Sequence, residues 1–140
     1  MISKIIKLTI IFFFFFSKLQ ANTEFFKKGL SLYNDKKFNE AKFKFEQDIV
    51  FNPKNEMSYL YLSKIFNNFK KKELEEQNLR AVILLNPKNE EAIYNLAKLK
   101  LDNSDYKKSK ELNQKLQILC VNFCDQSKRL EVEIKNLSEK

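Results

Sequence analysis

The two cysteines, Cys120 and Cys124, are the residues of this chain best suited to chemistry, and three residues separate them. The sequence has no histidine, which is the commonest general base and metal ligand in proteins. A metal site would need two further ligands. Redox-active pairs favour two intervening residues, which keep the attacking thiolate at a helix N-terminus. Four states of the pair stay open at this point: a structural disulfide, free thiols, a redox centre and a metal site.

Other arrangements of catalytic side chains are missing. Without histidine no Ser–His or Cys–His nucleophile can form, and the single glycine, Gly29, excludes a glycine-rich phosphate loop. The carboxylate pairs Glu75–Glu76 and Glu90–Glu91 are adjacent in sequence, and neighbouring residues on a helix point about 100° apart. We interpret these pairs as solvated helix surface and as first-turn partners of the helix dipole. We therefore predict that the chain is not an enzyme, and we predict no metal and no cofactor.

The charge of the chain comes mainly from lysine. The formal net charge is +8, and only Arg80 and Arg129 are arginines. Sequence-specific recognition of nucleic acid relies on the planar fork of arginine for bidentate contacts. We interpret the positive charge as a lysine-coated surface and expect no nucleic-acid partner.

The first 21 residues have the order of a secretory signal peptide. Lys4 and Lys7 precede an almost wholly apolar run, Leu8–Phe16, and polar and small residues up to Ala21 follow it. The run is too short to span a membrane, which takes about 20 apolar residues. We predict cleavage after Ala21, which leaves residues 22–140 with a net charge of +5 and no stable membrane anchor. An uncleaved anchor and a buried N-terminal helix are the alternatives.

The tetrapeptide Asn-Pro-Lys-Asn occurs twice, at residues 52–55 and at residues 86–89, 34 residues apart. Proline cannot sit inside a helix and the residue before it avoids helical angles, so each copy ends one helix. Asn55 and Asn89 are then placed to cap the next helix. Between these stops apolar residues recur at steps of three and four, which is the period of a helix. We predict helices over residues 23–35, 38–51, 55–69, 72–85, 89–102, 105–119 and 124–138.

The 34-residue period and the helix–turn–helix unit resemble the tetratricopeptide repeat. In the first copy the small residues of the family pattern are Gly29 and Ala41, which let two helices approach closely, and Phe45 fills the space above them. Glu75 in the second copy departs from the usual alanine, and the third copy has lost the proline. The resemblance covers about Thr23 to Leu119.

This resemblance implies an all-α fold, a right-handed α-solenoid of three helix pairs with a C-terminal capping helix. The predicted domain is residues 22–140, with repeats at about 22–55, 56–89 and 90–121 and the capping helix at about 124–138. In some bacterial members of the family, two cysteines with this spacing join the last repeat to a capping helix. Together with an even cysteine count in an exported chain, this favours a Cys120–Cys124 disulfide that holds the cap. The predicted apolar face of the cap is Leu130, Ile134 and Leu137.

In related proteins the first helix of each pair lines a concave groove that takes an extended peptide or a helix. The equivalent positions here carry aromatic, aliphatic, amide and charged side chains, a mixture that fits a protein-binding surface. They are Phe26, Leu30, Tyr33 and Asn34 in the first repeat; Met57, Leu60, Lys64, Asn67 and Asn68 in the second; and Glu91, Tyr94, Lys98, Leu101 and Asp102 in the third.

Some members of the family clamp a carboxylate tail with lysine, asparagine and arginine side chains. The equivalent positions here hold Phe26, Leu30, Tyr61, Glu91 and Asn95. The clamp is absent, and we do not predict that the chain binds chaperone tails.

Protein binding is the function that the resemblance implies. We expect an exported adaptor or scaffold that recruits an envelope protein, most naturally in the periplasm. A self-associating structural subunit of an envelope complex and a secreted effector are the alternatives.

Overall fold

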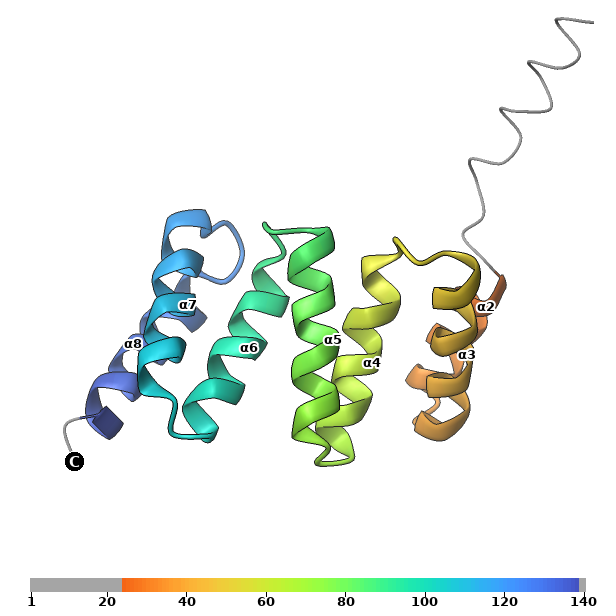
Figure 1. Cartoon of the computed structure of the whole chain (residues 1–140), viewed down its shortest axis with the longest axis horizontal. Helices are drawn as coiled ribbons and strands as arrows, with labels where there is room; N and C mark the ends of the chain where they lie inside the picture. The colour runs from red at the N-terminus through yellow and green to blue at the C-terminus, as the bar shows by residue number, and fades with distance from the viewer. Residues whose placement is uncertain (1–23, 139–140) are drawn as a thin grey trace, which may run out of the picture.

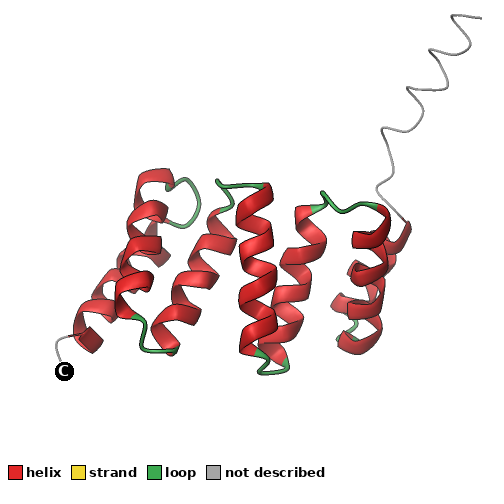
Figure 2. Ribbon diagram, in the orientation of Figure 1, coloured by secondary structure: helices red, strands yellow, loops and turns green. Residues whose placement is uncertain are grey.

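The computed structural model describes residues 24–138, and this part of the chain is helical apart from short connections (Figure 2). The helices are α2 (Glu24–Asn34), α3 (Phe38–Phe51), α4 (Glu56–Asn68), α5 (Lys72–Leu85), α6 (Glu90–Asp102), α7 (Tyr106–Leu119) and α8 (Cys124–Ser138). The predicted ranges match these bounds to within one residue, so the helix prediction is confirmed. The predicted signal peptide, residues 1–21, lies outside the described residues. Among the described helices, none is long and apolar enough to cross a membrane.

The helices stand side by side in chain order, each antiparallel to the next (Figure 1). Three hairpins, α2 with α3, α4 with α5 and α6 with α7, have the most extensive contacts, and α3 against α4 and α5 against α6 join neighbouring hairpins. Helix α8 packs on α7 and α6. This arrangement is the predicted α-solenoid of helix pairs with a C-terminal helix. We call the end that carries the loops 52–55, 86–89 and 120–123 the loop edge; it is uppermost in Figure 1.

The repeated tetrapeptide performs the capping that its sequence predicts. The Asn55 side-chain oxygen accepts a hydrogen bond from the backbone N–H of Met57 at 3.2 Å. The Asn89 side-chain oxygen accepts one from the backbone N–H of Ala92 at 3.0 Å. Each bond satisfies one of the donors that a helix N-terminus leaves without an intrahelical partner. The prediction that these two asparagines start α4 and α6 is confirmed.

The three tight turns at the opposite end also repeat with the 34-residue period. Lys36, Lys70 and Ser104 adopt the left-handed backbone conformation, with φ of 60°, 58° and 59°. Residues with a Cβ bear a small steric cost there. None of these three positions is a glycine, so the packing of the hairpins must stabilise the left-handed conformation of the turns.

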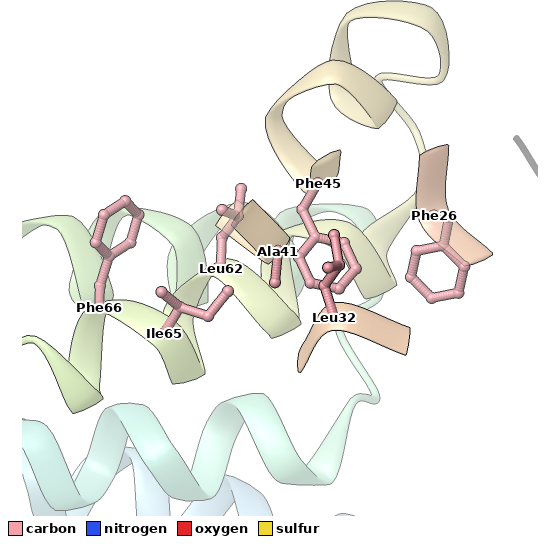
Figure 3. Close-up of a cluster of buried hydrophobic side chains, with 7 residues drawn as sticks. All are labelled: Phe26, Leu32, Ala41, Phe45, Leu62, Ile65 and Phe66. Atoms are coloured by element: carbon pink, nitrogen blue, oxygen red, sulfur yellow. The ribbon is translucent and has the colours of Figure 1, made fainter. Parts of the chain in front are cut away.

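The first hairpin closes over a glycine, as the family pattern predicts. A Cβ on Gly29 would lie 2.8 Å from Cε1 of Phe45, so only glycine lets this ring approach α2. The Phe45 ring is fully buried, stacks on Tyr61 at 5.2 Å and lies 5.7 Å from the Phe26 ring. Figure 3 shows the buried cluster around it: Phe26, Leu32, Ala41, Phe45, Leu62, Ile65 and Phe66.

A buried carboxylate joins the first two repeats. Asp48, on α3, is fully buried. One of its oxygens accepts hydrogen bonds from the Ser58 hydroxyl and from the side-chain amide of Asn55 at 2.7 Å. Both donors belong to the start of α4, so these two hydrogen bonds hold the N-terminus of α4 against α3.

The capping helix buries less of its predicted apolar face than expected. Leu130 and Ile134 are buried, and they form a cluster with Ala97 and Leu101 of α6. Leu137 is 37% exposed, so its predicted burial is wrong. It lies on the last turn of α8, beyond the residues that form this cluster.

Candidate functional site

A groove of about 460 Å³ runs across the three repeats on the face built by α2, α4 and α6. Its lining mixes amide, charged and aromatic side chains: Tyr33 from α2; Ser63, Lys64, Asn67 and Asn68 from α4; Glu75 from α5; and Glu91, Tyr94, Asn95, Lys98, Leu99 and Asp102 from α6. All of these except Glu75 come from the first helix of a pair. The residues lie together because homologous faces of successive repeats stack in register.

The structure brings eight residues of the predicted concave set to this groove: Tyr33, Lys64, Asn67, Asn68, Glu91, Tyr94, Lys98 and Asp102. Three others lie in the core instead of the groove: Phe26, Leu60 and Leu101. Leu60 is covered by residues of α5 and α6, Leu101 by α8, and Phe26 by the rings of α3 and α4. Leu30 is partly buried against the first core cluster, and Asn34 and Met57 are exposed outside the groove lining.

Glu75 belongs to the groove, although it was predicted on the solvated surface. It is 5% exposed, and Asn67 donates a hydrogen bond to it at 3.0 Å. Burial raises the pKa of Glu75 above its usual value, and the charge of Asp102 raises it further, against the lowering effects of Asn67 and Lys72. The sequence carried one sign that position 75 is unusual, because it has a glutamate where the family pattern usually has alanine.

The neighbouring Glu76 does not line the groove, because adjacent residues on a helix point about 100° apart. Lys100 of α6 donates a hydrogen bond to Glu76 at 2.7 Å, and Arg80 donates one at 2.9 Å. These two hydrogen bonds hold the pKa of the Glu76 carboxyl below its usual value, although partial burial opposes them. The two carboxylates therefore act on different surfaces and cannot share one ligand.

Both lysines of the groove are already paired with carboxylates. Lys64 Nζ lies 2.7 Å from Glu91 Oε1 and 4.9 Å from the centre of the Tyr61 ring. Lys98 Nζ lies 2.9 Å from Glu133 on α8. Partial burial acts to lower the pKa of Lys98, but the hydrogen bond and charge of Glu133 outweigh it and raise the pKa above its usual value.

Two amides of the groove are open to a ligand. Within the described part of the chain, the side chains of Asn68 and Asn95 make no hydrogen bond to protein, and both line the groove. Each amide offers both a donor and an acceptor. A peptide backbone, which carries one donor and one acceptor per residue, is complementary to such groups.

The disulfide loop, residues 120–124, contacts the α6 side of the groove. Cys120 and Cys124 form the predicted disulfide, with their Cα atoms 5.1 Å apart. Within this loop the Phe123 ring lies 5.6 Å from the ring of the groove residue Tyr94. The disulfide loop therefore contacts the groove residue Tyr94.

Glu90, at the start of α6, holds this same loop through three consecutive backbone N–H groups. It accepts hydrogen bonds from Val121 at 2.6 Å, Asn122 at 2.7 Å and Phe123 at 2.9 Å. The backbone N–H of Asn122 is the main cause that holds the pKa of Glu90 below its usual value. No group of three or more acidic or cysteine side chains that could hold a metal ion occurs among residues 24–138.

Comparison with solved structures decides the fold. The type III secretion chaperone SycD of Yersinia enterocolitica, solved with a peptide of the translocator YopD, superposes with a TM-score of 0.74 over 86% of this chain and 95% of SycD, at 14% identity. The TPR domain of Arabidopsis OM64 gives 0.68 over 82% and 92% of the two chains, at 22% identity. The chain has the tetratricopeptide-repeat fold.

A third tetratricopeptide-repeat structure has similar coverage. The TPR2B domain of yeast Sti1, solved in complex with pHsp70, gives a TM-score of 0.74 over 81% of this chain and 94% of its own, at 11% identity. No protein-family model and no curated protein matches the sequence.

Proposed function

We propose that this chain is a binding protein that takes a peptide segment of another protein into the groove of α2, α4 and α6. The observation that carries the proposal is the 460 Å³ groove whose lining, drawn from all three repeats, includes open amides and tyrosines. SycD was solved with a peptide of YopD and the Sti1 domain with pHsp70, so the same fold serves peptide or protein partners elsewhere.

The charges of the groove argue against an acidic tail as its ligand. Lys64 and Lys98 already neutralise Glu91 and Glu133, and Glu75 and Asp102 add further carboxylates. An acidic segment would find no unpaired cation in the groove, in keeping with the missing carboxylate clamp. We propose a neutral or basic extended segment whose backbone bonds to the open amides and whose side chains pack on Tyr33 and Tyr94.

We further propose that the protein works outside the cytoplasm, in the periplasm, with an envelope protein as its partner. Two observations support this compartment: the signal-like order of residues 1–21 and the Cys120–Cys124 disulfide. Disulfides form and persist mainly in oxidising compartments.

Capture from a native envelope fraction tests the proposal. The bait is the chain from Asn22 onward, kept non-reducing, and bound proteins are identified by mass spectrometry. A double variant, Asn68→Ala with Asn95→Ala, removes two groups that make no hydrogen bonds to protein, so its fold should be intact. Losing two hydrogen bonds costs about 2 kcal/mol, or roughly thirtyfold in affinity.

The matched control replaces two exposed asparagines outside the groove, Asn39→Ala with Asn136→Ala. It should bind the captured protein as the wild type does, in a titration with the purified partner. Equal affinity for all three proteins would show that the partner binds elsewhere.

A further inference from the structure

One buried carboxylate of the groove has no cation bonded to it. Glu75 lines the groove and is almost fully buried. One of its oxygens accepts the hydrogen bond from the side-chain amide of Asn67, whereas the other accepts none from residues 24–138, and no ion pair to Glu75 occurs among them. A buried charge is unfavourable unless an opposite charge and hydrogen bonds offset it. Part of what this carboxylate needs must therefore come from outside the chain.

The packing of the helix pairs does not require a carboxylate at this position. The equivalent residues of the first and third repeats, 34 residues away on either side, are Ala41 and Ser109. Both are fully buried, and the Ser109 hydroxyl donates a hydrogen bond to the backbone oxygen of Ala97 at 2.8 Å. Small side chains fill the position in two repeats, whereas the second repeat places there a glutamate that reaches the groove.

A second carboxylate adds to the negative charge beside Glu75. Asp102, in the last turn of α6, also lines the groove and accepts no side-chain hydrogen bond from the described part of the chain. Burial is the main cause that raises the pKa of Glu75, and the charge of Asp102 raises it further. A cation bound between the two carboxylates would offset both effects. We call Glu75, Asp102 and Asn67 the acidic end of the groove.

The lysines around the acidic end are bonded to other groups. Lys72 acts on Glu75 through its charge, but its Nζ donates a hydrogen bond to Asn103 at 2.7 Å. Lys98 also lies close enough for the acidic end to act on its pKa, but its Nζ donates to Glu133 at 2.9 Å. The acidic end is therefore complementary to a cation that a ligand brings with it.

We propose that the acidic end of the groove binds the side chain of a basic residue, lysine or arginine, in the bound peptide segment. The ammonium or guanidinium group donates to the open oxygen of Glu75 and to the Asp102 carboxylate, and a charge-assisted hydrogen bond of this kind is among the strongest that proteins make. The inference rests on the proposed function, and it narrows the ligand to a segment with a basic residue at a fixed place.

Selection from a phage-displayed library of short random peptides tests the proposal, with the chain from Asn22 onward as the bait. This chain contains all three core clusters, the first of which begins at Phe26. The wild type should enrich peptides that share a lysine or an arginine at one position of a common motif. Glu75→Gln keeps the shape of the side chain without its charge, so it should enrich peptides that lack this preference.

A double-mutant cycle with one enriched peptide, made by synthesis, measures the contact directly. In the peptide the basic residue is replaced by an uncharged analogue, citrulline for arginine or norleucine for lysine. This replacement should weaken binding to the wild type by at least about tenfold, because hydrogen bonds to a charged group are lost. It should change binding to Glu75→Gln by less than about twofold. Exchanging lysine and arginine at the same place shows which of the two the site prefers.

Glu73→Gln is the matched control, because it removes the same charge from an exposed residue of the same helix outside the groove lining. It should keep the full effect of the peptide replacement. Asp102→Asn should reduce that effect by about two- to fivefold, since Asp102 is exposed and its ion pair is weaker. Circular dichroism checks that each variant folds.

The outcomes separate this inference from the proposed function. Suppose that the enriched peptides no longer bind Asn68→Ala with Asn95→Ala, yet the uncharged peptide is weakened equally for the wild type and Glu75→Gln. The groove would then bind peptides without a site for a basic residue, and the inference would be wrong. Enriched peptides without a common basic residue would also overturn it. A wild type that enriches no peptide would count against both proposals, and displacement of the peptide by calcium chloride alone would assign the carboxylates to a metal ion.

Discussion

Replacing Gly29 by alanine tests whether the close approach of the first hairpin is essential. The new Cβ would lie 2.8, 3.0 and 3.1 Å from three atoms of the Phe45 ring. That ring has little room to retreat, because it is fully buried between Phe26 and Tyr61. Overpacking a core costs about 1–3 kcal/mol, whereas alanine gains about 1 kcal/mol over glycine in a helix. Because the enclosed ring cannot retreat, we take the upper part of that range, about 2–3 kcal/mol, and expect a net loss of about 1–2 kcal/mol.

Urea denaturation followed by circular dichroism measures this loss as a lower midpoint at an unchanged slope. Ser31→Ala is the control, because Ser31 is exposed on the same helix and its replacement changes helix propensity alone. The control should be neutral or slightly stabilising. A Gly29→Ala protein as stable as the wild type would refute the claim that the glycine is there to admit the Phe45 ring.

A double-mutant cycle separates the clash from other effects of the glycine. Phe45→Leu removes the ring atoms that the new methyl group would meet. In that background Gly29→Ala should be neutral or stabilising by up to about 1 kcal/mol. An equal loss in both backgrounds would mean that Phe45 is not the cause.

Two further predictions concern groups whose pKa shifts have opposite signs. The pKa of Glu75 is raised in the folded state, so this carboxylate costs stability once the pH rises through that value. Glu75→Gln should therefore raise the urea midpoint near neutral pH, and the gain should disappear below the usual glutamate pKa of 4.5. The pKa of Glu90 is lowered, so its stabilising effect is present above 4.5 and is lost as the pH falls through the folded value. Glu90→Gln should speed amide hydrogen exchange at Val121, Asn122 and Phe123 relative to the wild type at neutral pH, and unchanged exchange would contradict the hydrogen bonds from Glu90.

The sequence alone determined the helices and their order, because the signals that define them act locally. A proline ring prevents a helix from continuing through it. Each copy of Asn-Pro-Lys-Asn, at 52–55 and 86–89, therefore ends a helix irrespective of its tertiary contacts. Asn55 and Asn89 capped the next helices through N–H groups only two or three residues away. The 34-residue interval then implied a stack, since one pair of helices cannot bury its own apolar faces.

Only the tertiary structure decided which side chains face the groove. Helical periodicity identifies an apolar stripe but not the element that covers it. Leu60 and Leu101 were therefore predicted to line the groove, although in the structure residues of α5, α6 and α8 cover them. Glu75 looked like solvated surface, yet α4 and α6 enclose it beside Asn67. Glu90 meets its three amide partners across more than 30 residues. Contacts of that range depend on how successive helix pairs are displaced and rotated, which is a property of the whole stack rather than of any segment.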